Sequence, residues 1–158
     1  MEKKEINYIK GDATNPQAEG KKIIVHVCND IGGWGKGFVL ALSKRWLKPE
    51  QEYRNWYKSG NDFKLGEVQF VEVDSDIIVA NMIGQRGIKG TKSVPPIRYE
   101  AIDKCLKKVG DKANEIHASV HMPRIGCGLA GGEWRLIEPL INQNLIHRNI
   151  DVFVYDLD

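Results

Sequence analysis

The segment KIIVHVC, residues 22–28, is an almost uninterrupted run of apolar and β-branched side chains. Such a run is typical of a strand that is buried on both faces, as occurs in a parallel sheet covered by helices on both sides. Further strand patterns occupy segments 6–10, 66–73, 76–83, 119–125 and 151–157. The segments 66–73 and 76–83 lie close enough in sequence to form a hairpin-like pair.

Helical periodicity alternates with these strands. From Tyr99 to Ile116, apolar residues recur at spacings of three and four, which places them on one face of a helix. Further helices are expected over 38–47, over 49–58 and from 134 to 145. Strands that alternate with helices predict an α/β domain with a largely parallel sheet covered on both faces.

Composition limits the classes of partner. A chain of 158 residues with 42% hydrophobic and 28% charged residues predicts one domain that spans 1–158. The net charge of +2 gives no reason to expect a nucleic-acid partner. No apolar run approaches the roughly 18 residues of a membrane helix, so we expect a soluble protein with no membrane partner.

The cysteines are few and widely spaced. Cys28, Cys105 and Cys127 form neither the paired pattern of a zinc site nor a dense disulfide framework, which favours a cytoplasmic protein without a bound metal. A zinc enzyme that uses Cys28, Cys127, His26 and His121 is an alternative, although the spacing matches no known ligand pattern.

Two glycine-rich segments each follow a predicted strand and precede a predicted helix. They are CNDIGGWGKGF, residues 28–38, and PRIGCGLAGGEW, residues 123–134. Ligands of open α/β sheets bind at the carboxyl ends of the strands, where unpaired N–H groups at helix starts attract phosphate. Neither segment has the spacing of a P-loop or a dinucleotide-binding turn. Each cluster alone is explained by a strand-to-helix turn, but two at equivalent positions favour a ligand such as a diphosphate.

Three motifs in order resemble the macro domain family, which binds ADP-ribose. They are GDAT at 11–14, the glycine loop that begins at Asn29, and PRIGCGL at 123–129. The resemblance implies a three-layer α/β/α sandwich around a six-stranded mixed, largely parallel sheet, and no cofactor. PRIGCGL is most similar to the branch that contains the terminal ADP-ribose protein glycohydrolase and the yeast-type ADP-ribose-1''-phosphate phosphatase.

The resemblance assigns roles to particular residues. Asp12 would accept the adenine amino group, with Ala13 beside it, although a turn residue is the alternative for Asp12. Tyr155 would flank the adenine or serve in ordinary packing. Asn29 would face the distal ribose. Two loops would hold the ligand: Cys28, Gly33, Trp34, Gly35, Lys36, Gly37 and Phe38 in the first, and Pro123, Arg124, Ile125, Gly126, Cys127, Gly128, Leu129 and Ala130 in the second.

Catalysis by a lysine adduct does not fit the residues present. In the glycohydrolase branch a lysine forms the covalent sugar adduct and works with an aspartate. This chain has Ala130 in place of the aspartate, and its segment NMIGQRG, in the region of the lysine, contains no lysine. Because no serine, cysteine or metal constellation is evident, we expect a hydrolase in which a positioned water removes a distal phosphate, acetyl or carboxylate substituent. The candidate catalytic residues are Asn29, Asp30 and His26. The alternatives are a non-catalytic reader of ADP-ribose, a core role for His26, and a loop-bracing role for Asp30.

Two further expectations concern the loops. A side chain at Gly126 or Gly128 should obstruct the phosphate site while leaving the fold largely intact. Segment 84–98 is long for a connection and is rich in basic residues, which suits either a lid over the site or a solvated surface loop. These basic residues are Arg86, Lys89, Lys92 and Arg98.

Overall fold

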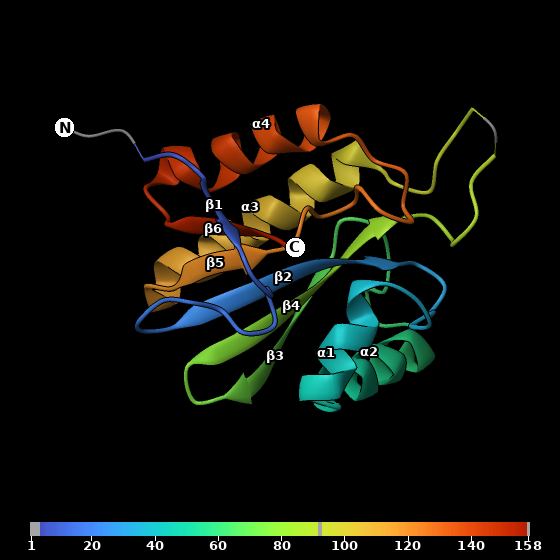
Figure 1. Cartoon of the computed structure of the whole chain (residues 1–158). Helices are drawn as coiled ribbons and strands as arrows, with labels where there is room; N and C mark the ends of the chain where they lie inside the picture. Colours follow the sequence, from blue (N-terminus) through green and yellow to red (C-terminus); the bar gives the residue numbers. More distant parts are fainter. Residues whose placement is uncertain (1–3, 92, 158) are drawn as a thin grey trace.

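Residues 4–91 and 93–157 are described by a computed structural model, in which six strands form one sheet in the order β1-β6-β5-β2-β4-β3 (Figure 1). Each neighbouring pair runs parallel except β3 with β4, which is antiparallel. The sheet is therefore mixed and largely parallel, as predicted. Its strands are β1 (Asn7–Lys10), β2 (Lys22–Asn29), β3 (Val68–Asp74), β4 (Ile77–Gln85), β5 (Ser119–Met122) and β6 (Val152–Asp156).

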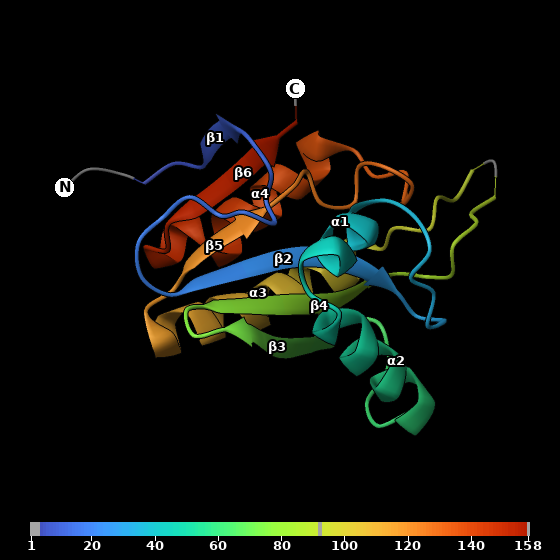
Figure 2. The same cartoon turned by 60° about the horizontal axis from the view of Figure 1, so that its bottom comes forward.

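Helices cover both faces of this sheet. Figures 1 and 2 show α1 (Phe38–Arg45) and α2 (Lys48–Ser59) on one face, and α3 (Tyr99–Ile116) and α4 (Trp134–Asn144) on the other. The helices α1 and α2 pack on the sheet through a smaller apolar cluster that includes Leu42 and Tyr53. A larger cluster lies under α3 and α4. The expected three-layer α/β/α architecture is confirmed.

The central strand β2 contributes to both apolar clusters. Ile23 and Val25 belong to the cluster under α3 and α4, whereas Ile24 and Cys28 face α1 and α2, and none of the four is more than 3% exposed. Alternate side chains of a strand point to opposite faces, so a strand between two helical layers needs apolar residues at nearly every position. The run KIIVHVC meets this need.

The structure departs from the sequence-based expectations at element ends. β5 ends at Met122 rather than at residue 125, directly before Pro123, which lacks the N–H that a strand pairing would use. A 3₁₀ helix, η1 (Ile146–Arg148), follows α4 and was not expected. Tyr155 lies on β6, which is not an edge strand, because β1 pairs with it on one side and β5 on the other. No helix within the described ranges is long and apolar enough to cross a membrane.

Two buried histidines predict a pH-dependent stability. Burial lowers the pKa of His26 to about 4, and burial together with nearby Lys22 lowers the pKa of His121 to about 4. In the unfolded chain both side chains bind protons below about pH 6.5. The unfolded state therefore gains protons first, and the free energy of unfolding should fall as the pH drops from 6.5 towards 4, by about 2 to 3 kcal/mol per histidine.

Urea unfolding at pH 7.5 and pH 4.5 measures this difference. The variant His121→Gln should lose part of the pH dependence, because it removes one of the two titrating side chains. Equal stability of the unsubstituted protein at both pH values would contradict the prediction.

Candidate functional site

Two adjoining cavities lie between the glycine-rich loops. One has a volume of about 260 Å³ and the other about 240 Å³, and Lys36, Gln85 and Leu129 are among the residues that line both. The predicted residues brought together in the larger one are His26, Lys36, Gly37, Phe38, Pro123, Arg124, Ile125, Gly126, Gly128, Leu129 and Ala130. Those in the smaller one are Cys28, Asn29, Gly33, Trp34, Gly35, Lys36 and Leu129. We call the two together the cleft.

The charge of the cleft suits an anion. Lys36 and Arg124 line it, and among the described residues no carboxylate does. Helix α1 begins at its edge, where the N-cap residue Gly37 supplies no side-chain hydrogen bond to the first N–H groups. Those N–H groups and the positive end of the helix dipole favour a bound phosphate.

The side chain of Asn29 holds the first glycine loop closed on itself. Its Nδ2 donates to the carbonyl of Gly33 at 2.9 Å, and its Oδ1 accepts the backbone N–H groups of Ile31 and Gly33. The single proton of the Tyr53 hydroxyl is shared between the Asn29 carbonyl, at 2.6 Å, and the same Oδ1, at 2.9 Å. Asn29 therefore lines the cavity and braces the loop, with its amide oxygen and one amide N–H engaged.

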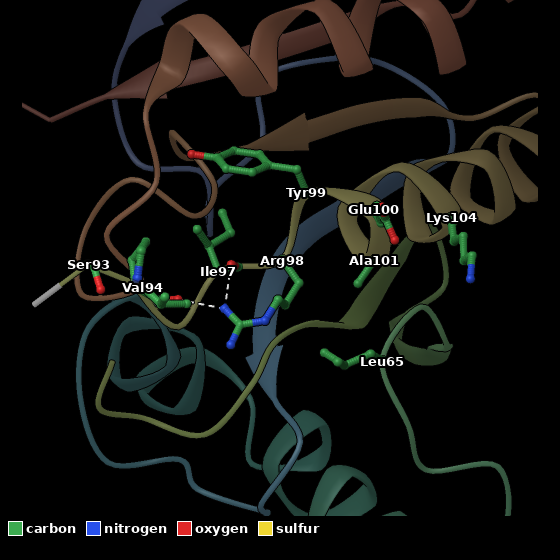
Figure 3. A pocket seen from close by; sticks show the side chains of 10 residues that line it. Leu65, Ser93, Val94, Ile97, Arg98, Tyr99, Glu100, Ala101 and Lys104 are labelled. Atoms are coloured by element: carbon green, nitrogen blue, oxygen red, sulfur yellow. Dashed lines mark hydrogen bonds between the residues drawn. The ribbon is translucent and has the colours of Figure 1, made fainter. Parts of the chain in front are cut away.

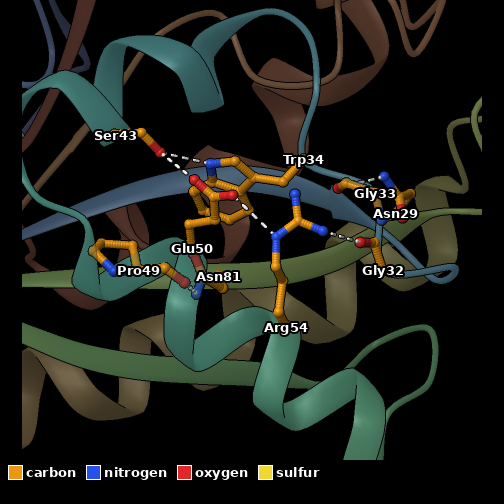
Figure 4. Close-up of polar contacts among 9 residues, drawn as sticks. All are labelled: Asn29, Gly32, Gly33, Trp34, Ser43, Pro49, Glu50, Arg54 and Asn81. Atoms are coloured by element: carbon orange, nitrogen blue, oxygen red, sulfur yellow. Dashed lines mark hydrogen bonds and ion pairs between the residues drawn. The ribbon is translucent and has the colours of Figure 1, made fainter.

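A second set of polar contacts ties this loop to α1 and α2 (Figure 4). The indole N–H of Trp34 donates to Ser43 at 2.8 Å, and the Ser43 hydroxyl donates to Glu50. Arg54 pairs with the other oxygen of Glu50 and donates to the carbonyl of Gly32. These contacts hold the first glycine loop against α1 and α2.

Gly126 and Gly128 of the second loop are glycines for different structural reasons. The expectation that a side chain at Gly126 would leave the fold largely intact is therefore wrong. Gly126 has φ of +74°, and a Cβ there would lie 2.3 Å from Cδ1 of buried Ile97. Gly128 lies outside the left-handed region of backbone conformation and faces open space. Gly126 therefore serves the fold, whereas Gly128 lines the cleft and has room for a Cβ.

The residues predicted to meet adenine lie beyond one end of the cleft. Asp12 is exposed, and its Oδ1 accepts both the N–H and the hydroxyl of Thr14 at 2.8 Å, so Oδ2 takes part in neither bond. Ala13 is buried. Arg124 connects this end to the cleft, because it forms two hydrogen bonds with the side-chain carboxylate of Asp156. The backbone carbonyl of Asp156 in turn accepts the N–H of Gly11.

The candidate catalytic residues are not equally available. His26 is 1% exposed, and its Nε2 lies 2.5 Å from Asn81, which supports its role as a core histidine. Asp30 is half-buried, and its Oδ1 accepts the N–H of Gly87 at 2.7 Å. It therefore braces the 84–98 segment, and its second oxygen is not part of that bond.

The three cysteines are free thiols, and Cys28 and Cys105 are buried. The side chain of Cys127 packs against the core, and burial raises the pKa of its thiol. Across residues 4–91 and 93–157, no group of three or more His, Cys, Asp or Glu side chains could hold a metal ion. The zinc alternative therefore finds no support in the described residues.

Segment 84–98 contributes residues to the cleft that were not predicted from the sequence. Gln85 and Ile88 line the cleft, together with Val27 and Val39. Their apolar or amide side chains carry no signal of function in sequence. Among the basic residues of this segment, Arg86 and Lys89 are exposed, while Lys92 lies outside the described residues.

A larger cavity, of about 720 Å³, lies beside the start of α3 and is lined by Leu65, Val94 and Lys104 among others. Figure 3 shows Arg98 at this cavity, with its guanidinium turned towards the preceding backbone. There it donates to the carbonyls of Pro95, Pro96 and Ile97. Arg98 thus holds residues 95–97 in place, and Ile97 in turn donates its N–H to Ala130 in the second loop.

Comparison with known proteins identifies the family. The fold matches that of a macrodomain protein from Streptomyces coelicolor with a TM-score of 0.86 and 56% identity, over 96% of this chain and 99% of that one. A protein from Bacteroides thetaiotaomicron matches with a TM-score of 0.95 and 62% identity, over 97% and 98% of the two chains. No family model matches the sequence. The chain belongs to the macrodomain family.

Two curated relatives extend this comparison. An ADP-ribose 1''-phosphate phosphatase of Candida albicans is 28% identical over 93% of this chain and 99% of its own length. The mouse chromodomain-helicase-DNA-binding protein 1-like is 35% identical over 95% of this chain. The chain spans 17% of that mouse protein's length.

The different roles of Gly126 and Gly128 predict different effects on stability. Gly126→Val should lower the free energy of unfolding by about 2 to 4 kcal/mol, because it combines backbone strain with a clash in the core. Gly128→Val should change it by less than about 1 kcal/mol, since the position is open. Thermal and urea unfolding of both variants measure the effect. Equal destabilisation by the two substitutions would contradict the assignment.

Proposed function

We propose that this protein binds ADP-ribose and its derivatives in the cleft between the two glycine-rich loops. The observation that carries the proposal is the lining of the cleft, where Lys36 and the uncapped start of α1 meet a space that no described carboxylate lines. Arg124 also lines it, with its guanidinium paired to Asp156. A diphosphate needs such surroundings, because its charge must be met by N–H donors and cations.

The residues at the two ends of the site suit the rest of the ligand. Asp12 would accept the adenine amino group with Oδ2 at one end, and the distal ribose would occupy the cavity lined by Asn29, Gln85 and Ile88 at the other. Family membership and the similarity to an ADP-ribose 1''-phosphate phosphatase support this ligand.

Isothermal titration calorimetry with ADP-ribose tests the proposal. The unsubstituted protein should bind one equivalent, and Asp12→Ala should weaken binding by about 1 to 3 kcal/mol because a charged hydrogen-bond partner is lost. Gly128→Val should weaken binding by tenfold or more, about 1.4 kcal/mol, by filling the phosphate site. A protein that ignores millimolar ADP-ribose would contradict the proposal.

We further propose slow hydrolysis of a substituent on the distal ribose by a positioned water. The relatives named as phosphatases favour this activity, and Asp30 is the candidate to orient or deprotonate the water. It directly follows Asn29, which lines the distal cavity, and it has an oxygen that does not take part in the Gly87 bond. His26 is too deeply buried for this role, and Asn29 shapes the loop. A non-catalytic reader is the competing function.

Substitution of Asp30 by Asn separates catalysis from loop bracing. The amide oxygen still accepts the Gly87 N–H, but the group can no longer act as a base. Asp30→Asn should reduce turnover of ADP-ribose-1''-phosphate, O-acetyl-ADP-ribose or ADP-ribosylated carboxylates by about 10² or more, at nearly unchanged ADP-ribose affinity. Chromatographic detection of products measures the turnover. Firm binding of ADP-ribose without any product from the three substrates would identify a reader instead.

A further inference from the structure

A chain of hydrogen bonds runs from the sheet to the segment that carries Asp12. Ser119 Oγ lies 2.8 Å from Nε2 of His121, and Nδ1 of His121 lies 2.7 Å from the Tyr155 hydroxyl. That hydroxyl accepts the backbone N–H of Gln17 at 2.8 Å. Tyr155 is 3% exposed and His121 fully buried, so these groups are shielded from competing water.

The positions of the protons in this chain of hydrogen bonds follow from counting the donors and acceptors in it. Burial holds the pKa of His121 at about 4, so its imidazole is neutral at pH 7 and carries a single N–H. The Tyr155 hydroxyl accepts from Gln17 and uses its own proton to donate to Nδ1 of His121. Nε2 then carries the imidazole proton and donates to Ser119. This arrangement satisfies each group and fixes the direction of the Tyr155 O–H bond.

The same tyrosine supports the segment 11–17 at both ends. Its ring lies beneath Gly11, where a Cβ would be 3.5 Å from the ring carbon Cδ2, and its hydroxyl holds Gln17. The N–H of Gly11 donates to the carbonyl of Asp156, the next residue on β6. Between these attachments the chain turns tightly, with the N–H of Asn15 bonded to the Asp12 carbonyl at 2.9 Å.

We propose that Tyr155 is a positioning residue, whose hydroxyl, oriented by His121, holds segment 11–17 in the conformation in which Asp12 presents Oδ2 to the ligand. Tyr155 then acts on the nucleoside end of the site from below, through the backbone, and does not flank the adenine ring. The ligand role of Asp12 rests on the proposed function, whereas the control of segment 11–17 by Tyr155 does not.

The experiment uses Tyr155→Phe, which keeps the ring under Gly11 and removes the hydroxyl. Hydrogen exchange of the ligand-free protein, followed by mass spectrometry, should show faster exchange in peptides that cover residues 11–18. Ser119→Ala, at the far end of the chain, should produce a smaller change in the same peptides. Ile141→Val, a core substitution in α4, lowers general stability and should leave these peptides unchanged.

Affinity measurements then ask whether Tyr155 acts through Asp12. Tyr155→Phe should raise the Kd for ADP-ribose about fivefold, the effect of one hydrogen bond. In an Asp12→Ala background the same substitution should raise the Kd less than about twofold, because the group it positions is gone. Ile141→Val should leave the Kd unchanged.

The outcomes separate the two claims. Unchanged exchange over residues 11–18 in Tyr155→Phe would overturn the proposal, and so would a fivefold effect that persists in the Asp12→Ala background. Faster exchange together with no ADP-ribose binding by the unsubstituted protein would reject the proposed function, while the control of segment 11–17 by Tyr155 would stand.

Discussion

The parallel pairing of β2 with β4 on one side and β5 on the other is the interaction on which the rest of the structure depends. Lys22 is in register with both Ile77 and Ser119, so the three strands start at the same edge and run in one direction. The pairing with β4 shifts register between Cys28 and Asn29, where the first glycine loop begins. Because parallel strands bring their carboxyl ends together, the pairing delivers both glycine loops to one place.

Contacts from the surrounding layers then make these loops rigid. Asn29 holds the first loop from within, and Tyr53 and Arg54 reach it from α2. In the second loop, the N–H of Gly132 closes on the carbonyl of Gly126 at 2.7 Å. A site whose backbone donors are already ordered loses less conformational entropy when a ligand binds, and more of the interaction energy then contributes to affinity.

Most of the fold could be predicted from the sequence because local patterns determine it. The apolar run of β2 requires burial on both faces, and the spacing of apolar residues in α3 matches its buried face. The two glycine loops were also found, because the turn from strand to helix and the approach of a ligand both leave glycines in the sequence. The ends of β5 and the presence of η1 depend on weaker local preferences, which the pattern does not reveal.

The roles of individual site residues could not be predicted in the same way, since long-range contacts decide them. Gly126 has the same local signal as Gly128, but Ile97, nearly thirty positions away in sequence, makes it a structural glycine. Asp30 is bonded to Gly87, and Tyr155 to Gln17, across the larger separations of 57 and 138 positions. Only the folded chain shows which polar groups are already engaged and which remain available to a ligand.

An NMR titration of the isotopically labelled protein with ADP-ribose tests the central claim most directly. We expect amide shifts to concentrate in segments 11–17, 29–38 and 124–131, which include Asp12 and the two glycine-rich loops. Shifts confined to residues 93–104, around the larger cavity beside α3, or no shifts at millimolar ligand, would contradict it.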